Sequence, residues 1–189
     1  MRPRRACAWA LVVAWAGAVL LAQQPDERPR YVNGTDLAYP ADYRSWVFLS
    51  AGLGMEYEEA AANRAPLFGN VFVNPSSYRA FQESGTWPDQ TTFVLEFRAS
   101  TGEGSINRAG RFQGDIVAVE ANVKDARLEG GWGFYNFGRT PSASTPPLPD
   151  DAGCLACHTE HGAVEKTFVQ FYPTLLEVAR EKGTLKPGF

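Results

Sequence analysis

Hydrophobic and polar residues alternate along the stretch "TTFVLEFR", residues 91–98. Successive side chains of a β-strand point to opposite faces, so Phe93, Leu95 and Phe97 share one face and Glu96 lies on the other. The pattern predicts a strand whose three large apolar side chains point inward. Glu96 is expected to be solvated, because carboxylates are rarely buried.

Other stretches predict further strands. In "DIVAVEANV", residues 115–123, apolar and polar side chains alternate, and Glu120 lies on the polar side, where it is also expected to be solvated. The aromatic stretch "GWGFYNF", residues 131–137, and the short apolar run at residues 71–73 also have strand composition. At least four strands therefore follow one another without regular alternation with helices, which favours an antiparallel sheet.

Helices are predicted beside these strands. Asn74, Pro75 and Gly85 suit the N-cap, the first turn and the end of a short helix. The stretch "GMEYEEAAANR", residues 54–64, favours a short surface helix that ends before Pro66. Both helices are expected to be peripheral to the sheet.

The C-terminal part combines a loop with a helical pattern. Residues 138–153 are rich in Pro, Ser and Thr and are expected to form a loop. Apolar residues recur at helical spacing over residues 164–179, and Pro173 is expected to kink or divide that helix. The expected fold class is α+β, a mainly antiparallel β-sheet with a few peripheral helices in a single domain.

The first 22 residues have the pattern of a secretory signal peptide. Three arginines precede an uncharged apolar run that ends at Ala22 and is just short of the roughly 20 residues that span a bilayer. Cleavage and export to the periplasm are therefore expected rather than membrane anchoring. Residues 23–38 are polar and are expected to be a flexible lead-in, with the folded domain over residues 39–189.

The net charge and the cysteine count bear on which partners the protein can bind and on whether it can form a disulfide framework. The formal net charge is −3, and cleavage of the signal would remove arginines and make it more negative, so nucleic acid is not an expected partner. Cleavage would also remove Cys7. Only Cys154 and Cys157 would then remain, which is too few for a disulfide framework.

These two cysteines belong to "CLACH", residues 154–158, the C-x-x-C-H pattern of covalent haem c attachment. The thiols of Cys154 and Cys157 can bond the two vinyl groups of one haem, and His158 can bind its iron. A dithiol oxidoreductase carries its C-x-x-C pair early in a βαβ unit, so this alternative fits the late position of Cys154 and Cys157 less well. In a zinc site the adjacent Cys157 and His158 would point awkwardly apart. One covalently attached haem c is the expected cofactor.

Two residues, His161 and Met55, are the candidates for a second axial ligand. His161 lies three residues after His158, so on a helix it would be on the same side and could not easily reach the other haem face. Met55, the only methionine left after cleavage, is the candidate sixth ligand of a simple electron-transfer cytochrome. Its surroundings favour a packing or surface residue. An open, five-coordinate iron is therefore the preferred expectation.

The order of these segments resembles the cytochrome P-460 family, which includes the cytochromes called c-prime-beta. The resemblance runs from "YPADYRSWV" through "VFVNPSSYRAF", "GDIVAVEANVKD" and "GWGFYNF" to "CLACH" and "FVQFYPTL". It implies a mainly antiparallel β fold with one haem c, often as a homodimer.

The resemblance also implies two kinds of activity. The founding members oxidise hydroxylamine with external electron acceptors and join the haem to a lysine, whose position is held here by Leu95. The c-prime-beta members bind nitric oxide at a haem crowded by aromatic rings, for which Phe68, Phe93 and Phe97 are candidates. We therefore expect an exported cytochrome that binds nitric oxide or a related small nitrogen species. Oxidation of hydroxylamine or nitric oxide, with electrons passed to another cytochrome, is the alternative.

Overall fold

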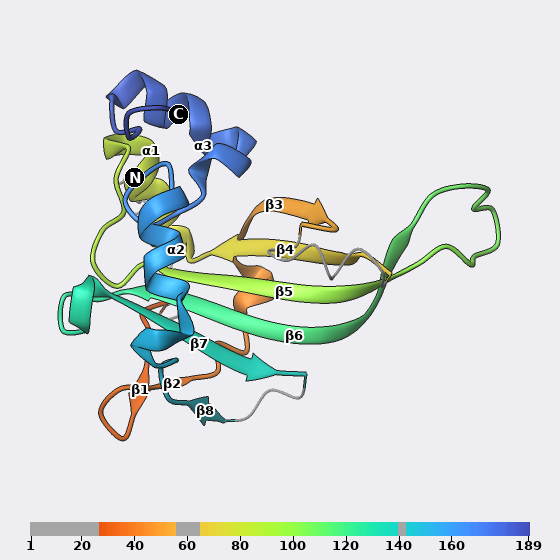
Figure 1. Ribbon diagram of the computed structural model, residues 1–189, viewed down its shortest axis with the longest axis horizontal. Helices are drawn as coiled ribbons and strands as arrows, with labels where there is room; N and C mark the ends of the chain where they lie inside the picture. The colour runs from red at the N-terminus through yellow and green to blue at the C-terminus, as the bar shows by residue number, and fades with distance from the viewer. Residues whose placement is uncertain (1–26, 56–64, 140–142) are drawn as a thin grey trace, which may run out of the picture.

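The protein is built around a five-stranded antiparallel sheet. The computed structural model describes residues 27–55, 65–139 and 143–189. The strands lie side by side in sequence order (Figure 1): β3 (Val47–Leu53), β4 (Leu67–Val73), β5 (Thr92–Thr101), β6 (Phe112–Lys124) and β7 (Trp132–Gly138). The predicted strands and the α+β fold class are confirmed. The predicted helix at residues 54–64 falls almost entirely on residues outside the described ranges.

A small second sheet is formed by β1 (Tyr31–Val32), β2 (Asp36–Ala38) and β8 (Ser144–Thr145). Between β1 and β2, Asn33 and Gly34 have φ angles of 52° and 88°, the left-handed conformation that an Asn-Gly hairpin turn requires. Leu37 is 1% exposed. The expected flexible lead-in therefore does not hold for residues 31–38, because pairing with β8 and burial of Leu37 order this segment.

Three α-helices are present in the described ranges: α1 (Pro75–Ser84), α2 (Cys154–His161) and α3 (Pro173–Lys182). Figure 1 shows α1 and α3 beside each other at one end of the sheet and α2 crossing near the same end. Short 3₁₀ turns connect the elements: η1 (Tyr43–Ser45), η3 (Glu129–Gly131), η4 (Asp150–Ala152) and η5 (Val169–Phe171). None of the helices in the described ranges is long and apolar enough to cross a bilayer.

The helix boundaries follow proline and glycine. Helix α1 begins at Pro75 and ends at Ser84, and the φ of 74° at the following Gly85 suits a left-handed C-cap, as predicted. Pro173 begins α3, because proline has no N–H and is favoured in the first turn. The predicted helix over residues 164–179 is therefore wrong before Pro173, where a loop and η5 replace it.

Both faces of the five-stranded sheet are covered. Strand β5 pairs with β6 so that Leu95 lies opposite Glu120 and Phe93 lies opposite Asn122. The predicted apolar sets of the two strands consequently face opposite sides. The helices cover one side, with a core that includes Leu49, Val73, Phe81, Trp87, Phe93, Phe134 and Leu175. The N-terminal segment covers the other, with Leu37, Tyr43, Trp46, Val94, Val119, Ala121, Tyr135 and Phe137.

Glu96 lies under the N-terminal segment and is only 2% exposed, so the expectation that it is solvated is wrong. Its carboxylate accepts hydrogen bonds from Tyr43, Arg44 and Arg98. Burial alone raises the pKa of Glu96, but the bonds from the two arginines and Tyr43 outweigh burial and lower the pKa to about 2. A charged carboxylate is tolerated here because both of its oxygen atoms accept hydrogen bonds.

Glu96→Gln should lower the free energy of unfolding by about 3 kcal/mol near neutral pH, because the two arginines lose their buried partner. A lowered folded-state pKa stabilises the fold above the ordinary value of 4.5, and this stabilisation is lost as the pH falls toward 2. Urea unfolding at several pH values should show the two proteins converging in acid. Glu177→Gln, which breaks the exposed Glu177–Arg180 pair, should cost less than about 1 kcal/mol. A pH-independent difference would contradict this account.

Candidate functional site

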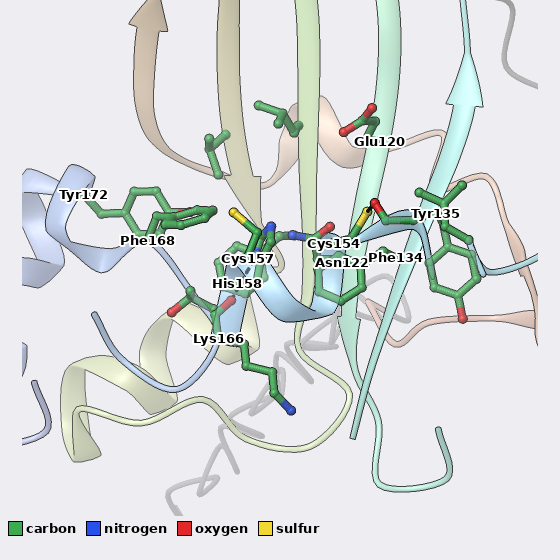
Figure 2. A pocket seen from close by; sticks show the side chains of 17 residues that line it. Glu120, Asn122, Phe134, Tyr135, Cys154, Cys157, His158, Lys166, Phe168 and Tyr172 are labelled. Carbon is green, nitrogen blue, oxygen red and sulfur yellow. Dashed lines mark hydrogen bonds between the residues drawn. The ribbon is translucent and has the colours of Figure 1, made fainter. Parts of the chain in front are cut away.

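A cavity of about 350 Å³ lies between helix α2 and the helix-covered face of the sheet. Cys154, Cys157 and His158 line it from α2, and Phe93 and Leu95 line it from β5. Figure 2 shows the two sulfur atoms on the same side of the helix, directed toward the strands. The fold thus brings these five residues, all named from the sequence as haem-site candidates, to one cavity.

Phe68, another of these candidates, is not among the residues that line the cavity. It pairs with Arg98 across β4 and β5, whereas Val71, which does line the cavity, pairs with Leu95. Side chains alternate along β4, so Phe68 belongs to the opposite face of the sheet. The sequence did not reveal this, because the register of β4 against β5 decides which face meets the cavity.

Met55 and Phe97 also lie outside the cavity lining. Met55 follows the end of β3 and is 53% exposed. Phe97 shares the face of Phe93 and Leu95 but lies further along β5. Neither residue therefore contacts the cavity that Cys154, Cys157 and His158 line.

The ring of His158 is held in a defined orientation. Its Nδ1 lies 2.9 Å from the carbonyl oxygen of Lys166, and its ring centroid lies 4.7 Å from that of Phe134 and 4.5 Å from that of Phe168. A carbonyl can only accept, so Nδ1 carries the proton and Nε2 keeps its lone pair. Burial lowers the pKa of His158, although the bond to Lys166 opposes this effect. The neutral ring is the form that binds a metal.

The loop between α2 and η5 approaches the helix too closely for a side chain at Gly162. A Cβ at this position would lie 2.7 Å from the His158 carbonyl oxygen and 2.7 Å from the Thr167 nitrogen. Glycine therefore lets the Lys166–Thr167 peptide reach the His158 ring. This requirement concerns close approach, since the φ angle of Gly162 is an ordinary −74°.

Cys154 and Cys157 are both half-buried. They stand three residues apart on α2, so both reach the same side of the helix. Burial and the neighbouring Glu120 raise the pKa of Cys154. Two thiols, an imidazole with a free Nε2 and apolar walls provided by Val71, Phe93 and Leu95 fit a flat, largely apolar porphyrin.

Glu120 also lines the cavity and is half-buried, so it does not lie on a fully solvated strand face as expected. Figure 2 shows its carboxylate coming from a strand across the cavity from α2. Burial raises its pKa, and Asn136 donates a hydrogen bond of 3.1 Å to its Oε1. The polar side of β6 faces the cavity because Glu120 pairs with Leu95. That register could not be read from the alternation in β6 alone.

Comparison with known proteins gives the family. Over residues 40–169, the sequence matches the family described as Cytochrome P460. The chain belongs to the Cytochrome P460 family. The match covers most of the chain, from the residues before β3 through the "CLACH" motif to η5, and the protein is accordingly a haem cytochrome of the c type. No curated protein matches the sequence.

Some residues of the cytochrome P460 site were missed from the sequence. Phe134 and Phe168 enclose the His158 ring, and the Lys166 carbonyl fixes its tautomer. The aromatic strand and the segment "FVQF" gave a signal for apolar surroundings. A backbone carbonyl has no sequence signal, because every residue carries one.

In this cytochrome P460, Gly162→Ala should lower the free energy of unfolding by about 1–3 kcal/mol, because the new methyl group clashes with backbone atoms. Urea unfolding of the haem-loaded protein measures the change. Gly102→Ala is the matched control, because a Cβ there would be an ordinary 3.5 Å from the Gly110 oxygen. Equal stability of the two variants would show that the loop can move away from α2 without cost.

Proposed function

We propose that the protein is an exported mono-haem cytochrome that binds nitric oxide or a related small nitrogen species at an open iron site. Cys154 and Cys157 would hold the haem through two thioether bonds, and His158 would bind the iron through Nε2. When bound, the haem supplies an iron with one coordination position left for a small ligand. Export rests on the sequence of the first 22 residues, which lie outside the described ranges.

The observation that carries this proposal is the composition of the cavity wall. The lining residues in the described ranges include one histidine, His158, and no methionine. Met55 is exposed and lies away from the cavity, so no observation favours the electron-carrier alternative with Met55 as sixth ligand. An iron held by His158 would therefore find among these residues no second histidine and no methionine, which are the sixth ligands of electron-carrying cytochromes.

The walls of the cavity favour small uncharged ligands. Val71, Phe93 and Leu95 offer no hydrogen bonds, so a charged ligand would not recover its lost hydration there. Burial lowers the pKa of His158 and raises the pKa of Glu120, which favours the neutral form of each. Nitric oxide is uncharged and small, and it needs little compensation for leaving water.

The purified ferrous protein should show a five-coordinate, high-spin spectrum that changes on addition of nitric oxide. Met55→Ala should leave both spectra unchanged, because its side chain is outside the cavity. Intact mass should match haem joined by two thioethers, and peptide mapping should find no haem-bound lysine, since Leu95 has no amine. A low-spin, six-coordinate spectrum that disappears in Met55→Ala would overturn the open-site proposal.

Glu120 favours a second candidate function, the oxidation of hydroxylamine. This substrate must lose protons as well as electrons, and a proton acceptor is useful only if it faces the bound substrate. Glu120 faces the cavity, and burial raises its pKa toward the range of a general base. The electrons would pass to another cytochrome.

A homodimer, which the family resemblance implies, remains a further part of this proposal.

If the protein turns over hydroxylamine, Glu120→Gln should reduce the rate by at least about 100-fold, because the amide cannot accept the proton. The rate of the unmodified protein should rise with pH as Glu120 loses its proton, above the ordinary value of 4.5 because burial raises its pKa. Steady-state assays with an electron acceptor measure both effects. Glu103→Gln, in the exposed loop between β5 and β6, is the control. Equal turnover in the two variants would exclude Glu120 as the proton acceptor.

A further inference from the structure

The peptide group between Lys166 and Thr167 is fixed at both of its ends. Its carbonyl oxygen accepts the bond from His158 Nδ1 at 2.9 Å, and its N–H donates to the carbonyl oxygen of Val164 at 2.9 Å. The Lys166 side chain extends away from the cavity (Figure 2), and its Nζ donates to the Gly130 carbonyl. The position of this one peptide therefore decides the length and angle of the His158 hydrogen bond.

Glu165, the residue before this peptide group, has a φ of 52°, a left-handed conformation that is uncommon for residues other than glycine. Such a backbone conformation persists where the surrounding structure fixes it, and it is frequent at functional sites. Its side chain supplies the fixing contacts. The Glu165 carboxylate accepts a hydrogen bond of 2.6 Å from Lys124 Nζ and one of 3.3 Å from the backbone N–H of Trp87.

The loop between α2 and η5 makes a second hydrogen bond to the rest of the protein through Thr167. The indole Nε1 of Trp87 donates a hydrogen bond of 2.8 Å to Thr167 Oγ1, and both side chains are buried. Lys124 Nζ also donates to the Trp87 carbonyl oxygen at 2.6 Å. Trp87 and Lys124 therefore connect the loop to β6 and to the segment before β5. They restrict the Lys166–Thr167 peptide through Glu165 and Thr167, the residues on either side of Lys166.

We propose that Glu165 and Lys124 are positioning residues that set the strength of the bond between His158 and the Lys166 carbonyl, and thereby the reduction potential of the haem. The inference rests on the proposed ligation of iron by His158. Neither residue lines the cavity, so each acts through the loop. A strong bond at Nδ1 increases the basicity of Nε2, which stabilises ferric over ferrous iron. A looser loop weakens that bond and favours ferrous iron.

The test compares haem-loaded Glu165→Gln with the unmodified protein. We expect the iron–histidine stretching frequency of the ferrous protein, measured by resonance Raman spectroscopy, to fall. The ratio of ferrous to ferric protein at a fixed potential should rise, by up to about tenfold, which corresponds to about 59 mV for one electron. Lys124→Gln should give the same shifts. The double variant should add little, because both changes break the same ion pair.

Glu177→Gln removes an exposed ion pair on α3 and should leave the frequency and the potential unchanged. If Glu165→Gln does not fold, Glu165→Gly takes its place, because glycine suits the left-handed backbone but lacks the carboxylate. The proposal is overturned if Glu165→Gly, or Glu165→Gln and Lys124→Gln, keep the original frequency and potential. Failure of the proposed function is distinguishable, because the unmodified protein would then show no iron–histidine stretch or no response to nitric oxide.

Discussion

The hydrogen bond from His158 Nδ1 to the Lys166 carbonyl is the constraint on which the site depends. It fixes the ring tautomer, directs Nε2 as the free nitrogen and determines where the loop after α2 must run. Several otherwise unrelated features follow from it, including Gly162 at a backbone contact and Glu165 in a left-handed conformation. Each of them keeps one backbone carbonyl within reach of one ring nitrogen.

The two candidate functions differ in which wall of the cavity matters. Leu95 and Phe93 make an apolar wall that offers no hydrogen bonds to water or to a charged ligand. Glu120, opposite Leu95 in the register of β5 and β6, adds one ionisable group to the same wall. Binding needs only the first property, whereas oxidation of a nitrogen hydride also needs the second. The two functions therefore share one pocket and differ in the use of a single carboxyl group.

Sequence patterns were reliable where local chemistry decides the outcome. Alternation identified β5 and β6, and Pro75, Gly85 and Pro173 marked helix boundaries because their backbone restrictions are intrinsic. The motif residues could be named because the spacing of two thiols and one imidazole is a local property. Glu96 and Glu120 could not be placed, since Tyr43 and Arg44, which cover Glu96, and Asn136, which binds Glu120, lie more than 15 residues away in the sequence. An alternating strand shows that it has two faces but not what covers each face.

Burial on both faces of the sheet also explains why Leu95 can be a fixed wall of the site. Its neighbours on β5 are Val94, which is fully buried in the N-terminal core, and Glu96, whose carboxylate is held by two arginines. A shift of β5 by one residue would turn Val94 and Glu96 toward the helix-covered face and separate the Glu96 carboxylate from Tyr43 and Arg44, so the register is strongly specified. Residues on the far face of the sheet therefore hold Leu95 toward the cavity. The precision of the site depends on contacts that never touch it.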